Sequence, residues 1–166
     1  ISLVLGSRFN ALLQSAEVSP IVSVAVFNDT ATTERKQRIE QMAERFGMED
    51  SLNRQMVSYS HGMRQKMMVI AALVHNPPVW ILDEPMTGLD PNAAYELKKM
   101  MREHADAGNC VFFSTHVLEV AEKLCDKIIM IRKGKDIYQG TLDELETQHR
   151  NKSLEEIFVE MTHEEF

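Results

Sequence analysis

The sequence predicts an α/β fold in which a mostly parallel sheet is flanked by helices. Segments whose apolar residues recur with helical spacing alternate along the chain with short apolar runs typical of strands. The clearest run, residues 79–82, lies between Pro78 and Pro85 and reads as a strand buried on both faces. Regular alternation of helix and strand favours a parallel sheet covered by helices.

Helices and strands are expected to alternate between residues 34 and 124. The first helix places its apolar residues on one face and is predicted to end at Gly47, a C-cap. Ser60 is the expected N-cap of the second helix, and Asp90 followed by Pro91 that of the third. The expected helices cover residues 34–46, 62–75, 91–107 and 116–124, and the strands residues 79–82 and 111–113.

The C-terminal part of the chain predicts a hairpin followed by two short helices. Residues 128–132 and 136–138 are strand-like and are joined through Gly134 in the turn. Capping boxes at Thr141 to Glu144 and at Ser153 to Glu156 predict the starts of the two helices.

Two adjacent carboxylates follow the strand at residues 79–82. Asp83 and Glu84 emerge at its carboxyl end, where ligands bind in open α/β sheets. An aspartate there can hold Mg²⁺, and the next carboxylate can accept a proton from an attacking water. The alternative is an ordinary solvated turn, because acidic residues are common in turns.

A second motif opens the helix at residues 62–75. Ser60 is a good N-cap and Gly62 allows another backbone or a ligand to come close. The free amides and the positive dipole end of such a helix suit a phosphate. The alternative is a capped core helix whose serine hydroxyl bonds to its own backbone.

The order of four motifs resembles the nucleotide-binding subunit of ATP-binding-cassette (ABC) transporters. They are S-H-G-M-R-Q-K at residues 60–66, W-I-L-D-E-P at 80–85, T-G-L-D at 87–90 and S-T-H at 114–116. In that family they correspond to the signature motif, the Walker B strand with its catalytic glutamate, the D-loop and the switch histidine. His61 and Met63 replace the commoner Gly and Gln, a variant similar to that of bacterial exporters. The endings at residues 140–145 and 153–158 also resemble exporter subunits.

This resemblance implies a P-loop NTPase-like fold and an ATPase that uses ATP and Mg²⁺. Two cassettes would bind ATP head to tail, and transmembrane permease subunits would convert their closure into transport. It implies a dimer with a second ABC ATPase subunit, at the cytoplasmic, inner face of the cell membrane. The implied catalytic residues are Glu84 and His116, the metal ligand is Asp83, and the ATP-binding residues are Ser60, Gly62 and Asp90.

Both Asp90 and His116 also have structural alternatives. Asp90 is an evident helix N-cap, which does not exclude a role in coupling two active sites. His116 follows the strand at residues 111–113 and is expected to project from the same sheet edge as Glu84, where a donor can contact a γ-phosphate. Its alternative is the first residue of the next helix.

The chain contains no P-loop of the form G-x-x-x-x-G-K-[ST], because Gly134 is its only glycine followed by lysine and no glycine lies five places before it. Gln14 is only a nominal Q-loop candidate. We therefore expect the N-terminal nucleotide-binding subdomain to be missing. Residues 1–28 stay unassigned, as a truncated or out-of-frame start, residues 29–140 form a partial ABC ATPase domain, and residues 141–166 form a C-terminal helical tail.

Composition argues against a nucleic-acid-binding, a membrane-spanning or a zinc-binding protein. The net charge of −7 argues against a nucleic-acid partner. No apolar run approaches the roughly 18 residues of a membrane span, and the start of the chain lacks the pattern of a signal peptide. Cys110 and Cys125 lack metal-site spacing and are expected to be reduced core thiols, and no zinc site is expected from the scattered histidines.

Two other functions fit the same residues. One is a half-site that is not an enzyme and supplies its signature motif to a partner cassette. An intact P-loop on an associated chain, and none upstream in this gene, would favour it. The other is a soluble ABC-type ATPase outside transport, which long heptad arms or a second cassette in the full gene would favour. The transported substrate is set by the transmembrane partner.

Overall fold

The computed structural model describes residues 32–149 and 152–163, which belong to two compact units divided between Phe113 and Ser114. We call them the N-terminal and the C-terminal unit. Residues 1–28, which include Gln14, lie outside the described residues. The elements up to the division are α2 (Thr32–Arg45), η1 (Glu49–Ser51), η2 (Met56–Ser58), α3 (His61–Leu73), β1 (Val79–Asp83), α4 (Pro91–Asp106) and β2 (Cys110–Ser114).

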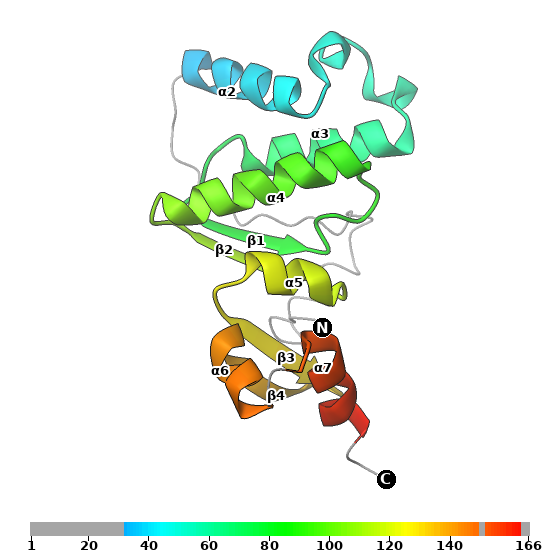
Figure 1. Cartoon of the computed structure of the whole chain (residues 1–166). Helices are drawn as coiled ribbons and strands as arrows, with labels where there is room; N and C mark the ends of the chain where they lie inside the picture. Colours follow the sequence, from blue (N-terminus) through cyan, green and yellow to red (C-terminus); the bar gives the residue numbers. More distant parts are fainter. Residues whose placement is uncertain (1–31, 150–151, 164–166) are drawn as a thin grey trace. The chain divides into compact units, whose positions relative to one another are not determined.

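The strands β1 and β2 are neighbours in one sheet. The amide of Cys110, where β2 begins, donates to the carbonyl of Pro78 just before β1, at 2.9 Å. Because their first residues are paired, we infer that both strands start at the same edge and run parallel, with α4 as the crossover between them. In Figure 1, α3 and α4 lie on one side of this sheet and α2 lies beyond them. The predicted helix and strand alternation is confirmed.

Strand β1 is buried on one face. Trp80 and Leu82 are buried, whereas Val79 is 43% exposed and Ile81 is half-buried. The expectation of burial on both faces is wrong here, because a continuous apolar run does not by itself distinguish the two cases. Trp80 packs against α4, where its ring stacks on that of His104 with centroids 4.1 Å apart.

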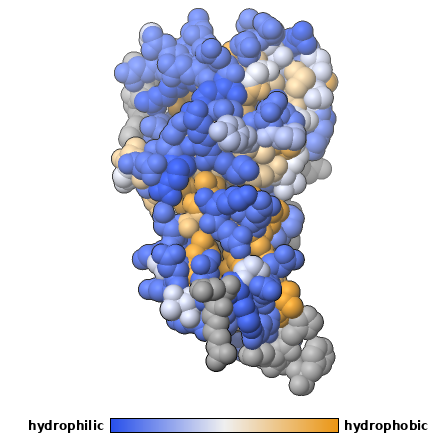
Figure 2. All heavy atoms as spheres, in the orientation of Figure 1, coloured by the Kyte–Doolittle hydropathy of each residue, from blue (hydrophilic) through white to orange (hydrophobic). Residues whose placement is uncertain are grey.

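The helices of the N-terminal unit begin and end close to the predicted positions. Helix α2 is followed by Gly47 with φ +62°, as expected of a left-handed C-cap. Ser60 caps α3 and Asp90 caps α4. Figure 2 shows polar side chains over the visible surface of α2, whose buried face includes Met42 and Ala43.

The C-terminal unit is a hairpin with three helices. Strands β3 (Ile128–Arg132) and β4 (Lys135–Gly140) are antiparallel, and their turn places Lys133 at φ 47° and Gly134 at φ 77°. Positive φ at both positions is the type I′ geometry that matches the twist of a hairpin. The helices are α5 (Leu118–Leu124), α6 (Leu142–Gln148) and α7 (Leu154–His163).

Both capping boxes predicted for this unit are confirmed. Thr141 and Glu144 exchange side-chain to backbone bonds of 3.2 and 2.9 Å. Ser153 and Glu156 do the same at 3.3 and 2.8 Å. The core of the C-terminal unit is an apolar cluster of buried side chains, which consists of Ala121, Ile128, Met130, Leu145, Leu154 and Ile157.

The two cysteines differ in environment. Cys125 is half-buried, and burial raises the pKa of its thiol to about 11, so it stays protonated at neutral pH. Cys110 is exposed, so the expectation of a core thiol is wrong for it, because it begins β2 at the sheet edge. Each helix in the described part of the chain is too short or too polar to cross a lipid bilayer.

Candidate functional site

The strand β1 ends in the two predicted carboxylates. Asp83 is its last residue and Glu84 follows, both half-buried. Glu84 has φ +44°, a left-handed conformation that non-glycine residues rarely adopt, and its carbonyl accepts a 3.0 Å bond from the amide of Thr87. Such backbone strain is costly and is concentrated at functional sites. The turn redirects the chain directly after the acidic pair.

Helix α3 begins at the predicted signature motif. The hydroxyl of Ser60 accepts the amide of Met63 at 3.2 Å, so the serine serves as the N-cap. The alternative in which the Ser60 hydroxyl bonds to its own backbone is therefore present. Binding of a phosphate by Ser60 stays a prediction. The first amides of a helix have no acceptor within the helix, so those of His61 and Gly62 are directed out of its N-terminus.

The loop at residues 87–90, which we call the TGLD loop, packs against the start of α3. Gly88 has φ +79°, and a Cβ atom there would lie 3.2 Å from Nε2 of His61 and 3.6 Å from Cγ of Gln65. A Cβ atom on Gly62 would lie 3.7 Å from the carbonyl oxygen of Gly88. The helix that carries Gly62 and the loop that carries Asp90 are therefore in direct contact.

Asp90 is held from two sides. Its Oδ1 atom accepts the amides of Asn92 and Ala93 at 3.1 and 3.0 Å, which caps α4. Its Oδ2 atom lies 2.7 Å from Nζ of Lys66, and Nζ also donates to the carbonyl of Phe46 at 3.0 Å. The hydrogen bond from Lys66, together with those amides, holds the pKa of the Asp90 carboxyl below its usual value. The carboxylate is therefore charged at neutral pH.

The six predicted site residues divide between the two units. Ser60, Gly62, Asp83, Glu84 and Asp90 belong to the N-terminal unit, and His116 belongs to the C-terminal unit.

His116 is exposed and lies between β2 and α5. The predicted helix at residues 116–124 starts later, at Leu118, with Val117 as its N-cap. The alternative in which His116 begins the helix is therefore wrong. The switch role of His116 stays a prediction.

Lys66 and the contact between His61 and Gly88 were not predicted from the sequence. A signal was nevertheless present, because residues 61, 62, 65 and 66 fall on one face of a helix. The partner of that face, the TGLD loop, could not be read from helical spacing.

Comparisons with known proteins identify the family. The family described as ABC transporter matches residues 4–87, a range that begins inside the segment left unassigned above. The chain is 39% identical over 126 residues to the ABC transporter ATP-binding protein NatA of Bacillus subtilis (strain 168), covering 76% of this chain and 51% of that protein. It is 36% identical over 112 residues to the daunorubicin/doxorubicin resistance ATP-binding protein DrrA of Streptomyces peucetius, covering 68% of this chain and 34% of that protein.

A solved structure, titled as the ATP binding subunit of an ABC transporter, agrees with the fold. It matches with a TM-score of 0.74 and 34% identity, over 81% of this chain and 57% of that chain. The chain thus spans about half the length of relatives such as NatA. The order of the motifs, the parallel β1–α4–β2 unit and these matches lead to one conclusion: the chain belongs to the ATP-binding proteins of the ABC transporter family.

Proposed function

We propose that this chain is part of an ATP-hydrolysing subunit that drives transport across a membrane. The observation that carries the proposal is the acidic pair at the carboxyl end of β1, with Glu84 in a left-handed conformation directly after Asp83. Phosphoryl transfer depends on positioned carboxylates of this kind. Membership of the ABC transporter family agrees with that chemistry.

The proposed roles follow the chemistry of each group. Asp83 is the ligand for Mg²⁺, an ion that commonly uses one or two carboxylates together with substrate phosphates. The bound ion would neutralise charge on the phosphates. Glu84 accepts a proton from the attacking water, and His116 donates to the γ-phosphate. The oxygen donors and half exposure of Asp83 suit a hard cation that arrives with ATP.

The remaining roles concern assembly. Ser60 and Gly62 would face the ATP held by a second copy or a related subunit, with the start of α3 directed at its phosphates. Asp90 would couple the two sites. The proposed partners are transmembrane permease subunits, which place the ATPase at the cytoplasmic face of the membrane.

Two features support export as the direction of transport. The signature variant with His61 and Met63 is similar to that of bacterial exporters. A relative, DrrA, carries daunorubicin/doxorubicin resistance in its name, and resistance by pumping a compound out fits an export subunit. Transport assays in inside-out vesicles that contain the full-length protein and its permease partners would test the direction.

Replacing Glu84 tests the proposed chemistry. In the full-length protein with its permease partners, Glu84→Gln should lower ATP turnover at least about a hundredfold, because it removes the base while keeping the shape of the side chain. ATP binding should persist, and ATP-bound dimers should accumulate, as measured by size-exclusion chromatography with labelled ATP. Asp83→Asn should instead raise the Mg²⁺ concentration that half-maximal turnover requires, because it removes an anionic ligand of the ion.

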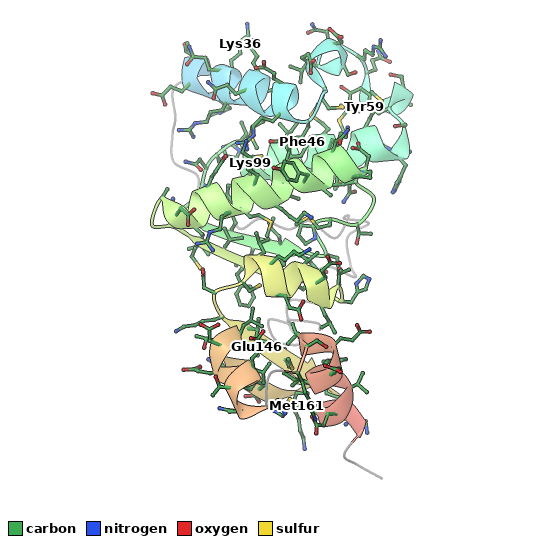
Figure 3. The ribbon with its side chains drawn as sticks, in the orientation of Figure 1. Lys36, Phe46, Tyr59, Lys99, Glu146 and Met161 are labelled. Atoms are coloured by element: carbon green, nitrogen blue, oxygen red, sulfur yellow. The ribbon has the colours of Figure 1, made fainter. Side chains whose placement is uncertain are left out.

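Glu146→Gln on α6 is the matched control, because Glu146, labelled in Figure 3, is exposed and lies outside the proposed site. Its turnover should equal that of the unmodified protein. Unchanged hydrolysis in Glu84→Gln would remove this residue from the mechanism. Failure of the unmodified complex to hydrolyse ATP would favour the half-site that is not an enzyme.

A further inference from the structure

We propose that Lys66 is a positioning residue that orients Asp90, so that the start of α3 and the TGLD loop respond together to ATP. The inference rests on the proposed function and deepens it. It names a link, within one copy of the chain, between α3, which carries the signature motif, and the TGLD loop. Lys66 itself need not touch ATP for this role.

One face of α3 makes the whole contact. His61, Gly62 and Gln65 border Gly88, as the distances to its Cβ position and carbonyl show. Lys66 continues the same face and reaches Asp90 two residues farther along the loop, at 2.7 Å. The first two turns of the helix thus hold the loop at both Gly88 and Asp90.

The ammonium group of Lys66 is placed to fix the carboxylate rather than only to neutralise it. The Lys66 side chain is 16% exposed, and Nζ bridges Oδ2 of Asp90 and the carbonyl of Phe46. A partly buried ammonium is stable only when such partners are present. Because Oδ1 already accepts two amides of α4, the bond to Oδ2 determines the remaining freedom of the carboxylate.

The bridge also reaches beyond the loop. Phe46 follows the last residue of α2, so Lys66 connects the end of α2 with the N-cap of α4. Helix capping alone does not require this arrangement, because a neutral asparagine caps a helix about as well as an aspartate. The charge pair therefore has a role that capping does not explain, and positioning of Asp90 accounts for it.

The test uses the full-length protein with its permease partners. Lys66→Met should lower kcat for ATP by roughly tenfold or more and change KM less than about twofold, because misplacing a group that acts in the transition state affects turnover. Lys66→Arg should recover part of kcat, since a guanidinium can still donate to Asp90. Lys36→Met is the control, because Lys36 is an exposed lysine of α2 (Figure 3) and should leave kcat unchanged.

A double-mutant cycle identifies the residue through which Lys66 acts. Asp90→Asn keeps a good N-cap and removes the charge that Lys66 holds. If Lys66 acts through Asp90, adding Lys66→Met to Asp90→Asn should cause little further loss of kcat. Equal losses in the two backgrounds, or unchanged kcat in Lys66→Met, would overturn the inference. If Lys66→Met alone folds poorly, Lys66→Gln replaces it in the cycle, because it also removes the charge that pairs with Asp90.

A second readout separates this inference from the proposed function. Hydrogen exchange at the amides of Asn92 and Ala93, followed by mass spectrometry, should be faster in Lys66→Met than in the unmodified protein and unchanged in Lys36→Met. Loss of hydrolysis in the unmodified complex would contradict the proposed function while leaving this result readable. Unchanged exchange would contradict the positioning role whether or not the protein hydrolyses ATP.

Discussion

In the part of the chain that the structure describes, three residues other than glycine have a positive φ, and the reason for it differs between them. Among the described residues, the non-glycine positions with positive φ are Asn76, Glu84 and Lys133. Asn76 lies shortly after α3, where asparagine is accepted in a left-handed C-terminal turn, and Lys133 occupies a hairpin turn that requires this geometry. Glu84 has neither reason. The role that we propose for its carboxylate would supply a functional reason for this strain.

Asp90 allows capping to be separated from charge at one residue. Asp90→Ala should lower the free energy of unfolding by about 1 kcal/mol, because two amides of α4 lose their acceptor. Asp90→Asn should cost less, because an amide oxygen still caps the helix. Urea unfolding of both variants at neutral pH measures the difference, and equal losses would show that charge outweighs the cap.

The pH dependence of the free energy of unfolding tests whether the charge of Asp90 contributes to stability. Because its folded-state pKa lies below its usual value, its charge stabilises the fold above the unfolded-state pKa, and this contribution is lost as pH falls through the lowered folded-state pKa. The difference between the unmodified chain and Asp90→Asn should therefore shrink in acid. The effect is modest because the side chain is about half exposed to screening solvent.

Local signals were predictable from the sequence, and contacts between distant residues were not. The caps at Ser60, Asp90, Thr141 and Ser153 are confirmed because each depends on a residue and the amides two or three positions later. The bond between Lys66 and Asp90 depends on how α3 meets the TGLD loop, which no periodicity encodes.

Among the helices of the N-terminal unit, Arg45 of α2 forms two hydrogen bonds to α4. Arg45 donates to Glu96 at 3.2 Å and to Glu103 at 2.8 Å. Burial opposes the charge of Arg45, but its bonds to Glu103 and Glu96 raise the pKa of the guanidinium overall. The alternation of α2, α3, β1, α4 and β2 followed from the sequence, whereas the one-sided burial of β1 did not, because its sequence is apolar on both faces.

Glycine substitutions test the packing of the TGLD loop on α3. Gly88→Ala should cost about 1–2 kcal/mol for its positive φ, plus a further loss because its Cβ would meet His61. Gly108→Ala is the matched control, since Gly108 has φ +86° with nothing within 4 Å of its Cβ position. Thermal unfolding should show Gly88→Ala as the less stable variant.

Replacing His61 by alanine tests whether its ring causes part of the loss in Gly88→Ala. In a chain with Gly88→Ala, His61→Ala should recover the packing part of the loss and leave the part due to φ, because alanine removes the ring that meets the new Cβ atom. If Gly88→Ala and Gly108→Ala are equally destabilised, then the contact between α3 and the loop carries no measurable energy.

At the scale of the whole molecule, the proposed site is shared between copies. Gly62→Asp is suited to test this, because a Cβ atom at Gly62 would lie 3.7 Å from the nearest carbonyl oxygen, an ordinary contact, and a carboxylate at a helix N-terminus is favourable for folding. The same carboxylate would repel the phosphates of ATP. The variant should therefore fold normally but fail as a signature motif.

Mixing two inactive variants distinguishes a shared site from a site within one copy. Full-length Gly62→Asp and Glu84→Gln should each hydrolyse ATP poorly as dimers of one kind. In a head-to-tail dimer of one of each, one site combines the intact Glu84 of the first variant with the intact Gly62 of the second. Turnover should therefore reappear in purified mixed dimers carrying two different tags. If mixed dimers stay as inactive as their parents, both residues act on ATP within the same copy, because then neither copy holds a complete set.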